Sequence, residues 1–471
     1  APSDFPLAKQ AGLDQALLDQ LAQSPGFEAV LPLAPLQQGL AYESWSQGED
    51  RLDDPYHVQL VVELVGPLDT ARLQEAFTRL LARHQILRLS LPLATVERGL
   101  GVLREQALDW QCEPAQGRTL EAILKQEHAQ TFDLANGPLI RVRVIEQDLE
   151  HHLLVVSNHH ALLDGWSTPV LMGELATLYR GETLEPALAW QDHLAWLASH
   201  DRDQALAYWR AHFADAQSLG ELNLPKPKTA QVGMAEQSIT LSADLTHALE
   251  RFARQNDLTL STVYEGAFML LLARLSGQTE VTIGVTRSGR SGERTGMDRA
   301  VGLYIGTLPL RTEVPLGIEL VAWLRALQQE QAGQEAYGHL SLSEIGHCAH
   351  LLGGQSLFEA LFVYENYPID AAAQTFAAEI EIKSVQGIDG THYPLALAVI
   401  PGQNTRLRLT FDQARLDEAV VSAFNAQLAE VLEAMVHAQA QACLGSLPLT
   451  SLTERTQVLE RFNDTAQPVT P

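Results

Sequence analysis

The chain has 471 residues, of which 46% are hydrophobic and 19% charged, a composition typical of folded proteins with sizeable apolar cores. This length exceeds one ordinary core and predicts two domains or a single unit with two lobes. The 32 basic and 58 acidic residues give a net charge of −26. Because no stretch concentrates Lys and Arg, the charge argues against binding to nucleic acid or to an anionic membrane.

The cysteines and the hydropathy pattern argue against further classes. Cys112, Cys348 and Cys443 are far apart and lack CxxC spacing, so the sequence predicts neither a disulfide framework nor a metal site. The first residues lack the charged start and apolar core of a signal peptide. No segment offers the roughly 18 uninterrupted apolar residues of a membrane helix. We therefore expect a cytoplasmic protein that does not act at a membrane.

In the first half of the chain, the apolar pattern predicts an extended, Pro-containing start followed by alternating helices and strands. Asp69 and Thr70 are placed to cap a helix. The short polar turn QDLE joins two β-branched runs and indicates a hairpin. The predicted helices are 13–21, 36–45, 69–84, 167–181, 190–200 and 202–213, and the predicted strands are 57–65, 139–146 and 151–158.

The second half repeats this pattern after a linker at LPKPKTAQ (224–231). Strands that alternate with helices in both halves predict an α/β protein with two lobes of similar size. The predicted strands are 237–242, 279–286, 356–367, 378–387, 394–402 and 406–413, and the predicted helices are 243–257, 260–277 and 418–438.

One stretch, SNHHALLDGWS (157–167), carries the residues best suited to chemistry. If residues 151–160 form a strand, His159 and His160 point to opposite faces, so at most one of them reaches a common reaction centre. Imidazole is the natural general acid or base near neutral pH. Asp164 lies just beyond the strand and is placed to brace the loop through an arginine. Most of the 16 histidines must be core or surface residues, so an inert histidine is the competing interpretation.

The pattern HHxxxDG resembles the condensation domains of non-ribosomal peptide synthetases, with His159, His160, Asp164 and Gly165 in the matching positions. Other motifs of that family follow in the same order over essentially the full chain. They are LAPLQQGLAYESW (33–45), RHQILRLSL (83–91), WQDHLAWL (190–197), VGLYIGTLPLR (301–311) and LFEALFVYENYP (357–368).

The resemblance implies two chloramphenicol-acetyltransferase-like lobes that form a V-shaped pseudo-dimer with a tunnel at their junction. It places an upstream connector at 1–30, the lobe with HHxxxDG at 31–215, a second lobe at 216–450, and a connector towards a downstream adenylation domain at 451–471. Upstream and downstream peptidyl carrier proteins deliver substrates on phosphopantetheine arms. No permanently bound cofactor and no metal are implied.

Carried over by position, His160 is the catalytic histidine, which deprotonates the amine, positions it or stabilises the tetrahedral intermediate. Gly165 lets the backbone and its N–H approach the pantetheine or the oxyanion. His159 and Asp164 are structural, and Asp164 is expected to pair with Arg290, with Arg287 as the alternative partner.

Five further residues are candidates for lining the tunnel. Trp166 and Ser167 border the pantetheine path in this interpretation; alternatively, Trp166 covers the core and Ser167 caps the next helix. Tyr364, Glu365 and Asn366 would line the acceptor side, and the alternative is a strand end with a turn at the lobe junction.

The reaction implied is amide-bond formation between two carrier-bound substrates in secondary-metabolite biosynthesis. The stretches FVYENYP, GLYIGTLP and LLDGWSTP resemble the branch that accepts a donor ending in a D-residue. Alternatives are an L-ended or fatty-acyl donor, a dehydrating or cyclising relative, and a non-catalytic docking platform. Gly306 departs from the family, which usually has Asn there.

Overall fold

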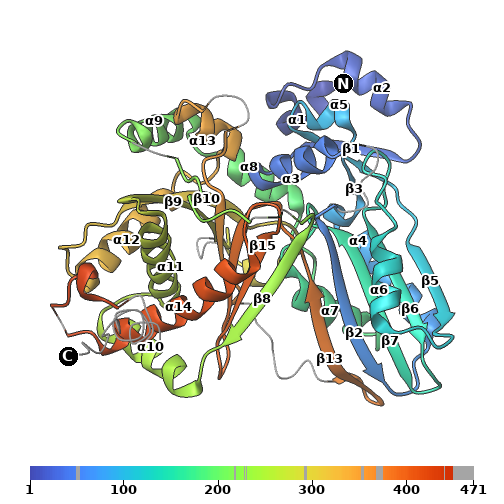
Figure 1. The fold of residues 1–471 in the computed structure, drawn as a ribbon. Coiled ribbons are helices and arrows are strands. Elements are labelled where there is room, and N and C mark those ends of the chain that lie inside the picture. The colour runs from blue at the N-terminus through green and yellow to red at the C-terminus, as the bar shows by residue number, and fades with distance from the viewer. Residues whose placement is uncertain are drawn as a thin grey trace, which may run out of the picture.

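The computed structural model describes residues 1–48, 54–216, 219–227, 229, 231–290, 294–351, 355–366, 375–439 and 441–448. These residues form two six-stranded sheets and one three-stranded sheet, surrounded by helices (Figure 1). The first large sheet has the order β12 (Thr375–Ala377), β13 (Ile380–Ile388), β2 (His57–Val65), β7 (His151–His159), β6 (Ile140–Glu146), β5 (Asp109–Pro114). The second has the order β10 (Gly306–Glu313), β9 (Glu280–Arg287), β11 (Ala360–Tyr364), β14 (Leu395–Ile400), β15 (Arg406–Asp412), β8 (Met234–Thr240).

The helices lie around the three sheets. In Figure 1 the sheets lie side by side, and β2 and β8 come close near the centre and diverge below it. The helices of the first half are α1 (Pro6–Gln10), α2 (Gln15–Ala22), α3 (Pro35–Ser46), α4 (Thr70–Arg83), α5 (Leu93–Val96), α6 (Leu120–His128), α7 (Ser167–Tyr179), α8 (Trp190–Ala198) and α9 (Arg202–Phe213). Those of the second half are α10 (Ala243–Gln255), α11 (Leu260–Ser276), α12 (Leu320–Glu335), α13 (Leu342–Cys348) and α14 (Glu418–His437).

Strand β2 shows how the sequence pattern builds the first core. Val62 and Leu64 point into the large core that α4 and α7 cover, whereas Val61 points to the opposite face, where it packs with Ile123 of α6. The strand is buried on both faces, which explains its nearly continuous β-branched and apolar sequence. The predicted strand 57–65 and the predicted hairpin of β6 and β7 are both confirmed.

Helix α4 begins as its sequence predicts. The Asp69 carboxylate accepts a hydrogen bond from the Arg72 backbone N–H at 3.0 Å, which satisfies one of the free donors of the first turn. Its apolar residues repeat every three or four positions and are buried, so the helix packs one face against the sheet.

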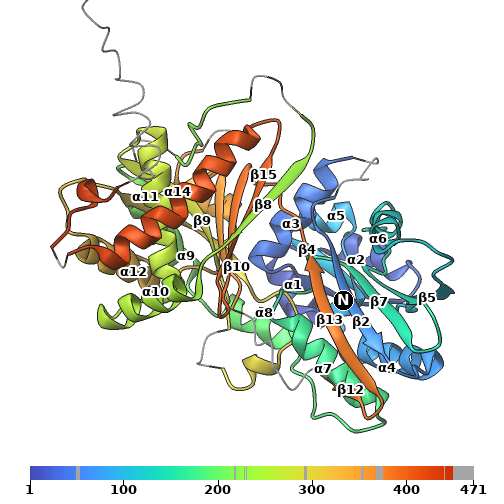
Figure 2. The ribbon, with the colours of Figure 1, turned by 60° about the horizontal axis from the view of Figure 1, so that its bottom comes forward.

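The first sheet contains strands from both halves of the chain. Strand β13 pairs antiparallel with β2, with Leu60 opposite Gly387 and Leu64 opposite Ile382. Figure 2 shows β13 in orange beside β2 in blue. The expected division into a lobe of residues 31–215 and a lobe of residues 216–450 therefore does not separate the two sheets, because strand partners depend on long-range packing that local periodicity does not encode.

The N-terminal segment is packed onto the first half. Its start is a 3₁₀ turn at Pro2–Asp4 followed by α1, so the expectation of an extended opening is wrong: Pro2 and Pro6 occupy first-turn positions, where proline suits a helix. Residues 27–32 form β1, which pairs with β4 (Leu100–Arg104) beside β3 (Leu89–Ser90). Leu17, Leu18 and Leu21 of α2 are buried against Val30 and Val102. The expected connector at 451–471 lies outside the described residues.

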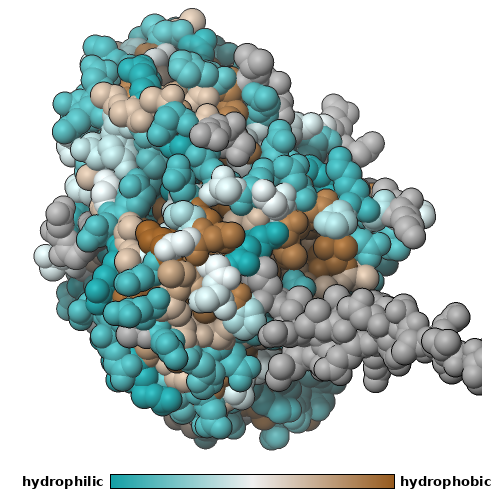
Figure 3. Space-filling view, turned by 60° about the vertical axis from the view of Figure 1, so that its left-hand side comes forward, coloured by the Kyte–Doolittle hydropathy of each residue, from teal (hydrophilic) through white to brown (hydrophobic). Residues whose placement is uncertain are grey.

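The face of the molecule drawn in Figure 3 is largely hydrophilic. In Figure 3 hydrophobic residues gather near the middle of one face and polar residues surround them. Within the described chain, one helix, α14, is long and apolar enough by composition to cross a membrane, with a mean hydropathy of 1.3. Its residues Phe424, Leu428 and Leu432 are buried in the core of the second half, so α14 serves as a core helix.

Candidate functional site

His160 follows directly after β7 and is half-buried. Its backbone N–H donates to the Tyr56 carbonyl at 2.8 Å, and its Nδ1 lies 2.9 Å from the Leu163 carbonyl. A carbonyl only accepts, so Nδ1 carries the proton and donates it, which leaves a lone pair on Nε2. Nε2 forms no hydrogen bond with a described residue, and the side chain lines a cavity. The free nitrogen is therefore placed to act as a base.

His159 is fully buried, and both of its ring nitrogens have partners. The Ala161 backbone N–H donates to Nδ1 at 3.1 Å, so the proton of the neutral ring is on Nε2. Nε2 lies 3.0 Å from Ser44 Oγ and 3.7 Å from Asp54 Oδ2. The opposite orientations predicted for the two histidines are present, and His159 holds the end of the strand in place.

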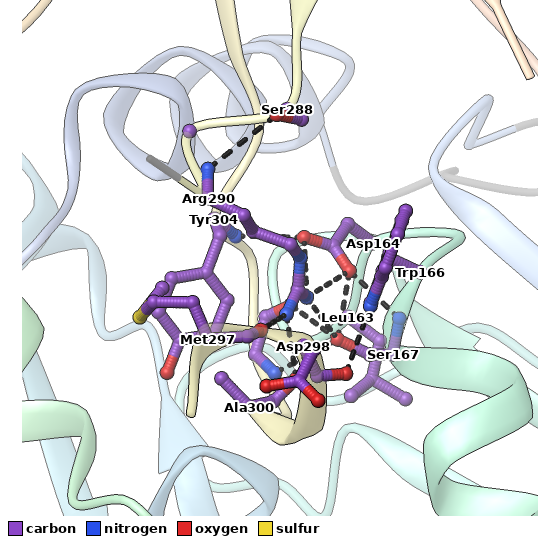
Figure 4. A network of polar contacts seen from close by, with 12 residues as sticks. Leu163, Asp164, Trp166, Ser167, Ser288, Arg290, Met297, Asp298, Ala300 and Tyr304 are labelled. Carbon is purple, nitrogen blue, oxygen red and sulfur yellow. Dashed lines mark hydrogen bonds and ion pairs between the residues drawn. The ribbon is translucent and has the colours of Figure 1, made fainter. Parts of the chain in front are cut away.

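Asp164 and Arg290 form the expected ion pair (Figure 4). Arg290 Nη2 lies 2.8 Å and 3.0 Å from the two carboxylate oxygens, and the side chains are 0% and 5% exposed. Asp164 also accepts from Ser167 N and Oγ at 2.9 and 2.7 Å and from Tyr304 N at 2.9 Å. A buried carboxylate with this many donors is held in one orientation.

Arg290 links this pair to the loop that leads into β10. Its Nη1 donates to the carbonyl oxygens of Met297 and Ala300, both at 2.8 Å, and its guanidinium carbon lies 4.6 Å from the centre of the Tyr304 ring. Gly289 precedes it with φ of 59°, and a Cβ there would lie 1.9 Å from the Tyr304 carbonyl oxygen. Only glycine fits this close approach.

A cavity of about 1370 Å³ lies beside these residues, and both halves of the chain line it. Strand β7 contributes Val156 and Asn158, and His160, Asp164 and Gly165 lie next to them. The second half contributes Glu365 and residues of β10, α13, β14 and β15. A cavity of this size accommodates a drug-sized or larger ligand.

Three of the predicted lining residues face away from the cavity. Tyr364 packs on the core of the second half, because side chains alternate along β11: Leu361, Val363 and Glu365 reach the cavity and Tyr364 does not. Ser167 is fully buried and donates its hydroxyl proton within the Asp164 network. Trp166 Nε1 donates to the Asp298 carbonyl at 3.0 Å, and this residue is not among those lining the cavity.

Three more expectations need correction. Asn366 is exposed and does not line the cavity, because β11 ends at Tyr364. Arg287, the alternative partner of Asp164, lies instead 3.5 Å from the buried Glu265 carboxylate on α11. Ser167 forms no side-chain cap either, because the first residue of α7 is Ser167 itself.

Glu365 does line the cavity, and Arg408 holds it. The Glu365 carboxylate accepts from Arg408 Nη2 at 2.7 Å. Burial raises the pKa of the Glu365 carboxyl, and the Arg408 charge opposes that rise. The pair therefore forms a polar patch on a wall that is otherwise rich in apolar side chains.

Several site residues carry no signal in the sequence. Tyr304 lies inside the motif 301–311, yet it acts through its backbone N–H, which every residue but proline has. Tyr56 acts on His160 through its carbonyl in the same way. His392 is an ordinary polar residue far from the quoted motifs, and only the fold brings it to the cavity. Ser44 lies inside the motif 33–45, but its contact with His159 depends on the fold. In the described part of the chain, no group of three His, Cys, Asp or Glu residues is arranged to hold a metal ion.

Comparisons with known proteins agree with this geometry. The profile of the condensation domain family matches residues 27–459. The chain is 34% identical to a linear gramicidin synthase of Brevibacillus parabrevis over 99% of its length, and 31% identical to chondramide synthase of Chondromyces crocatus over 98%. It spans only 10% and 13% of the lengths of these relatives.

Solved structures share the fold. The condensation domain of the Monacolin K polyketide synthase superposes with a TM-score of 0.74 at 20% identity, covering 89% of this chain and 100% of that one. A four-domain non-ribosomal peptide synthetase superposes with a TM-score of 0.77 at 16% identity, covering 92% and 35%. Because the family profile matches almost the whole chain, this protein belongs to the condensation domain family, whose members form the amide bonds of non-ribosomal peptide synthesis.

Proposed function

We propose that this chain joins a donor thioester on an upstream carrier protein to the amine of an aminoacyl acceptor on a downstream carrier protein. The amine nitrogen attacks the thioester carbonyl, and the tetrahedral intermediate collapses to an amide with release of the donor carrier's thiol. The observation that carries this proposal is the Nε2 of His160, which has no hydrogen-bond partner among the described residues, on a side chain that lines a cavity shared by both halves of the chain.

His160 takes the proton that the attacking amine loses. A protonated amine has no lone pair for attack, so a neutral imidazole within hydrogen-bond reach favours the reactive form. The Leu163 carbonyl fixes the tautomer in which Nε2 is free, and the bond from the His160 N–H to Tyr56 fixes the backbone. His160 therefore supplies a base whose orientation is set before substrate binds.

The Asp164–Arg290 pair positions this base instead of reacting. It joins the loop after His160 to Arg290 and residues 297–304 of the second half, and Tyr304 N and Ser167 complete its hydrogen bonds. Gly165 lines the cavity one residue later, and its N–H forms no hydrogen bond with another described residue. We assign this N–H to the thioester oxygen, which gains negative charge during attack.

The phosphopantetheine arms of the two carriers bring the reacting groups, so the chain needs no cofactor of its own. The arms would enter the cavity from opposite sides, with an adenylation domain following downstream and the assembly in the cytoplasm. The resemblance of FVYENYP, GLYIGTLP and LLDGWSTP to one branch of the family supports a donor that ends in a D-residue.

A single-turnover assay tests the proposal. Both carriers are loaded with defined aminoacyl groups, D- and L-ended donors are compared, and the amide product is quantified by mass spectrometry. We expect faster condensation of the D-ended donors, and loss of at least about a hundredfold in rate for His160→Ala, the lower range for a general base.

The matched control is His151→Ala, which removes an exposed histidine at the other end of the same strand. Equal rates for both donor series would overturn the stereochemical assignment and leave the reaction class intact. A His160→Ala variant as fast as the His151→Ala variant would overturn the catalytic assignment itself.

A further inference from the structure

A second imidazole, that of His392, also lines the cavity. It lies on the connection from β13, in the sheet of the first half, to β14, in the sheet of the second half. His392 is exposed, yet the Tyr56 ring with which it bonds is buried. An exposed side chain on a cavity wall with one buried partner is available to a ligand.

The position of His392 is fixed from two sides. Gly390 packs so closely on the turn before β2 that a Cβ there would lie 2.7 Å from the Pro55 carbonyl oxygen. The His392 ring lies 4.0 Å from the Tyr393 ring and 5.9 Å from the Tyr56 ring, centre to centre. The connection between the sheets is therefore seated on the residues that also hold the His160 backbone.

The hydrogen bond between Tyr56 Oη and His392 Nδ1 sets the tautomer of His392. Burial raises the pKa of Tyr56 well above its ordinary value, so the phenol keeps its proton. The hydroxyl has no other hydrogen-bond partner in the described chain, so it donates to Nδ1. A neutral imidazole that accepts at Nδ1 carries its own proton on Nε2.

His392 is neutral under working conditions. Neighbouring protein atoms displace water from the ring, which disfavours its charged form and lowers the pKa of His392 to about 4. Even the ordinary histidine pKa of about 6.5 would leave the ring mostly neutral at a pH of about 8. The Nε2–H group forms no hydrogen bond with a described residue and is not among the buried polar atoms that lack a partner, so it is open to the cavity.

The two imidazoles in the cavity thus have opposite hydrogen-bonding roles, and Tyr56 is bonded to both. Its carbonyl holds the His160 backbone, and its hydroxyl holds His392 Nδ1. His160 presents a lone pair on Nε2, and His392 presents a proton on Nε2. Amide formation from a thioester and an amine is helped by an acceptor for the amine's proton and by a hydrogen-bond donor to the carbonyl oxygen.

We propose that His392 is a substrate-contacting residue, whose Nε2–H donates a hydrogen bond to a carbonyl oxygen of a carrier-bound substrate. This inference rests on the condensation activity proposed above. A neutral donor suits a carbonyl oxygen, which is uncharged in the thioester and in any peptide bond of the donor. The same N–H also stabilises this oxygen when the oxygen gains negative charge during attack, because the hydrogen bond from Tyr56 keeps the proton of His392 on Nε2.

The test compares His392 with a histidine outside the cavity. His392→Phe keeps the ring volume and removes the donor, and His247→Phe makes the same change at an exposed histidine of α10 that does not line the cavity and whose ring has no described hydrogen bond. We expect kcat/KM to fall about three- to tenfold for His392→Phe, the range for one neutral hydrogen bond, and to change less than about twofold for His247→Phe. The substrates are the donor and acceptor carriers that the wild-type chain condenses fastest.

Two further variants separate the donor from the shape of the ring. His392→Gln retains an N–H at a similar reach and should recover most of the lost kcat/KM. Tyr56→Phe removes the hydroxyl that fixes the tautomer of His392, so its kcat/KM should be lower than that of the wild type. A His392→Phe variant that matches His247→Phe, or a His392→Gln variant as slow as His392→Phe, would overturn the inference. Absence of product with the wild-type chain would instead refute the condensation proposal, so the two failures are distinguishable.

A readout independent of activity is the ¹⁵N spectrum of the imidazoles, which distinguishes protonated from unprotonated ring nitrogens. The wild-type spectrum should show His392 protonated at Nε2 near neutral pH, with assignment by loss of the signal in His392→Gln. In Tyr56→Phe the two tautomers should mix. A wild-type signal from the Nδ1-protonated form would contradict the inference.

Discussion

Replacing Asp164 with Asn is the sharpest test of how the site is held together. The substitution keeps the size of the side chain and removes its charge. In the native structure Oδ1 accepts from Ser167 N, Ser167 Oγ and Arg290 Nη2, and Oδ2 accepts from Arg290 Nη2 and Tyr304 N. Each oxygen faces only donors, so the NH₂ group of Asn meets donors in either orientation.

The magnitude follows from the burial of the pair. The side chains of Asp164 and Arg290 are 0% and 5% exposed, so the variant leaves a buried guanidinium without its counter-charge. Breaking a buried ion pair in this way costs about 3–5 kcal/mol. Against a typical total of about 5–15 kcal/mol, this loss releases the loop of residues 294–304 from the first half or unfolds the chain.

Urea denaturation and amide hydrogen exchange measure the two outcomes. We expect a fall of about 3–5 kcal/mol in the free energy of unfolding, and faster exchange of the Ser167 and Tyr304 N–H groups, which donate to Asp164. Glu182→Gln, which breaks the exposed pair with Arg180, is the control and should change little. An Asp164→Asn chain that is as stable as the control, with unchanged exchange at Tyr304, would refute the reasoning.

Three more substitutions have defined outcomes. Gly306→Asn introduces the residue usual in the family into open cavity space, so the thermal midpoint should stay constant while turnover of the bulkiest donors falls first. Burial lowers the pKa of His57 to about 3, so the unfolded chain binds the extra proton between about pH 6.5 and 3 and stability falls as the pH drops through that range; His57→Phe should flatten this slope in urea titrations. Ser44→Ala removes the hydroxyl beside His159 Nε2 and should lower the free energy of unfolding by about 1 kcal/mol in the same assay, whereas an unchanged value would mean that the contact is not stabilising.

The sequence predicts elements well where one period dominates. The strand at 57–65, the helix from Thr70 to Arg83 and the hairpin of β6 and β7 are confirmed because their apolar spacing determines which faces are buried. Strand β13 is different: six of its nine residues are exposed although four of the nine are Ile or Val, so its pattern does not identify the sheet that it joins. Its partner β2 lies more than 300 residues earlier in the chain.

The candidate site shows the same division. The roles of side chains in a dense motif, such as the His159 and His160 orientations and the Asp164–Arg290 pair, are accessible from spacing and from family resemblance. The prediction that Tyr364 lines the cavity is wrong because successive side chains of a strand point to opposite faces, and its neighbours Val363 and Glu365 are the residues that face the cavity. Contacts made by backbone groups, such as the Tyr304 N–H, can be made by almost any residue type. A single sequence therefore does not reveal them.

The pairing of β13 with β2 limits how this chain can be divided or recombined. A fragment that ends near residue 215 would expose the unpaired edge of β2, and edges of that kind template aggregation. A chimaera that takes its early part from one synthetase and its late part from another would join two strand edges that did not evolve together. Engineering by module exchange should therefore transplant the chain intact.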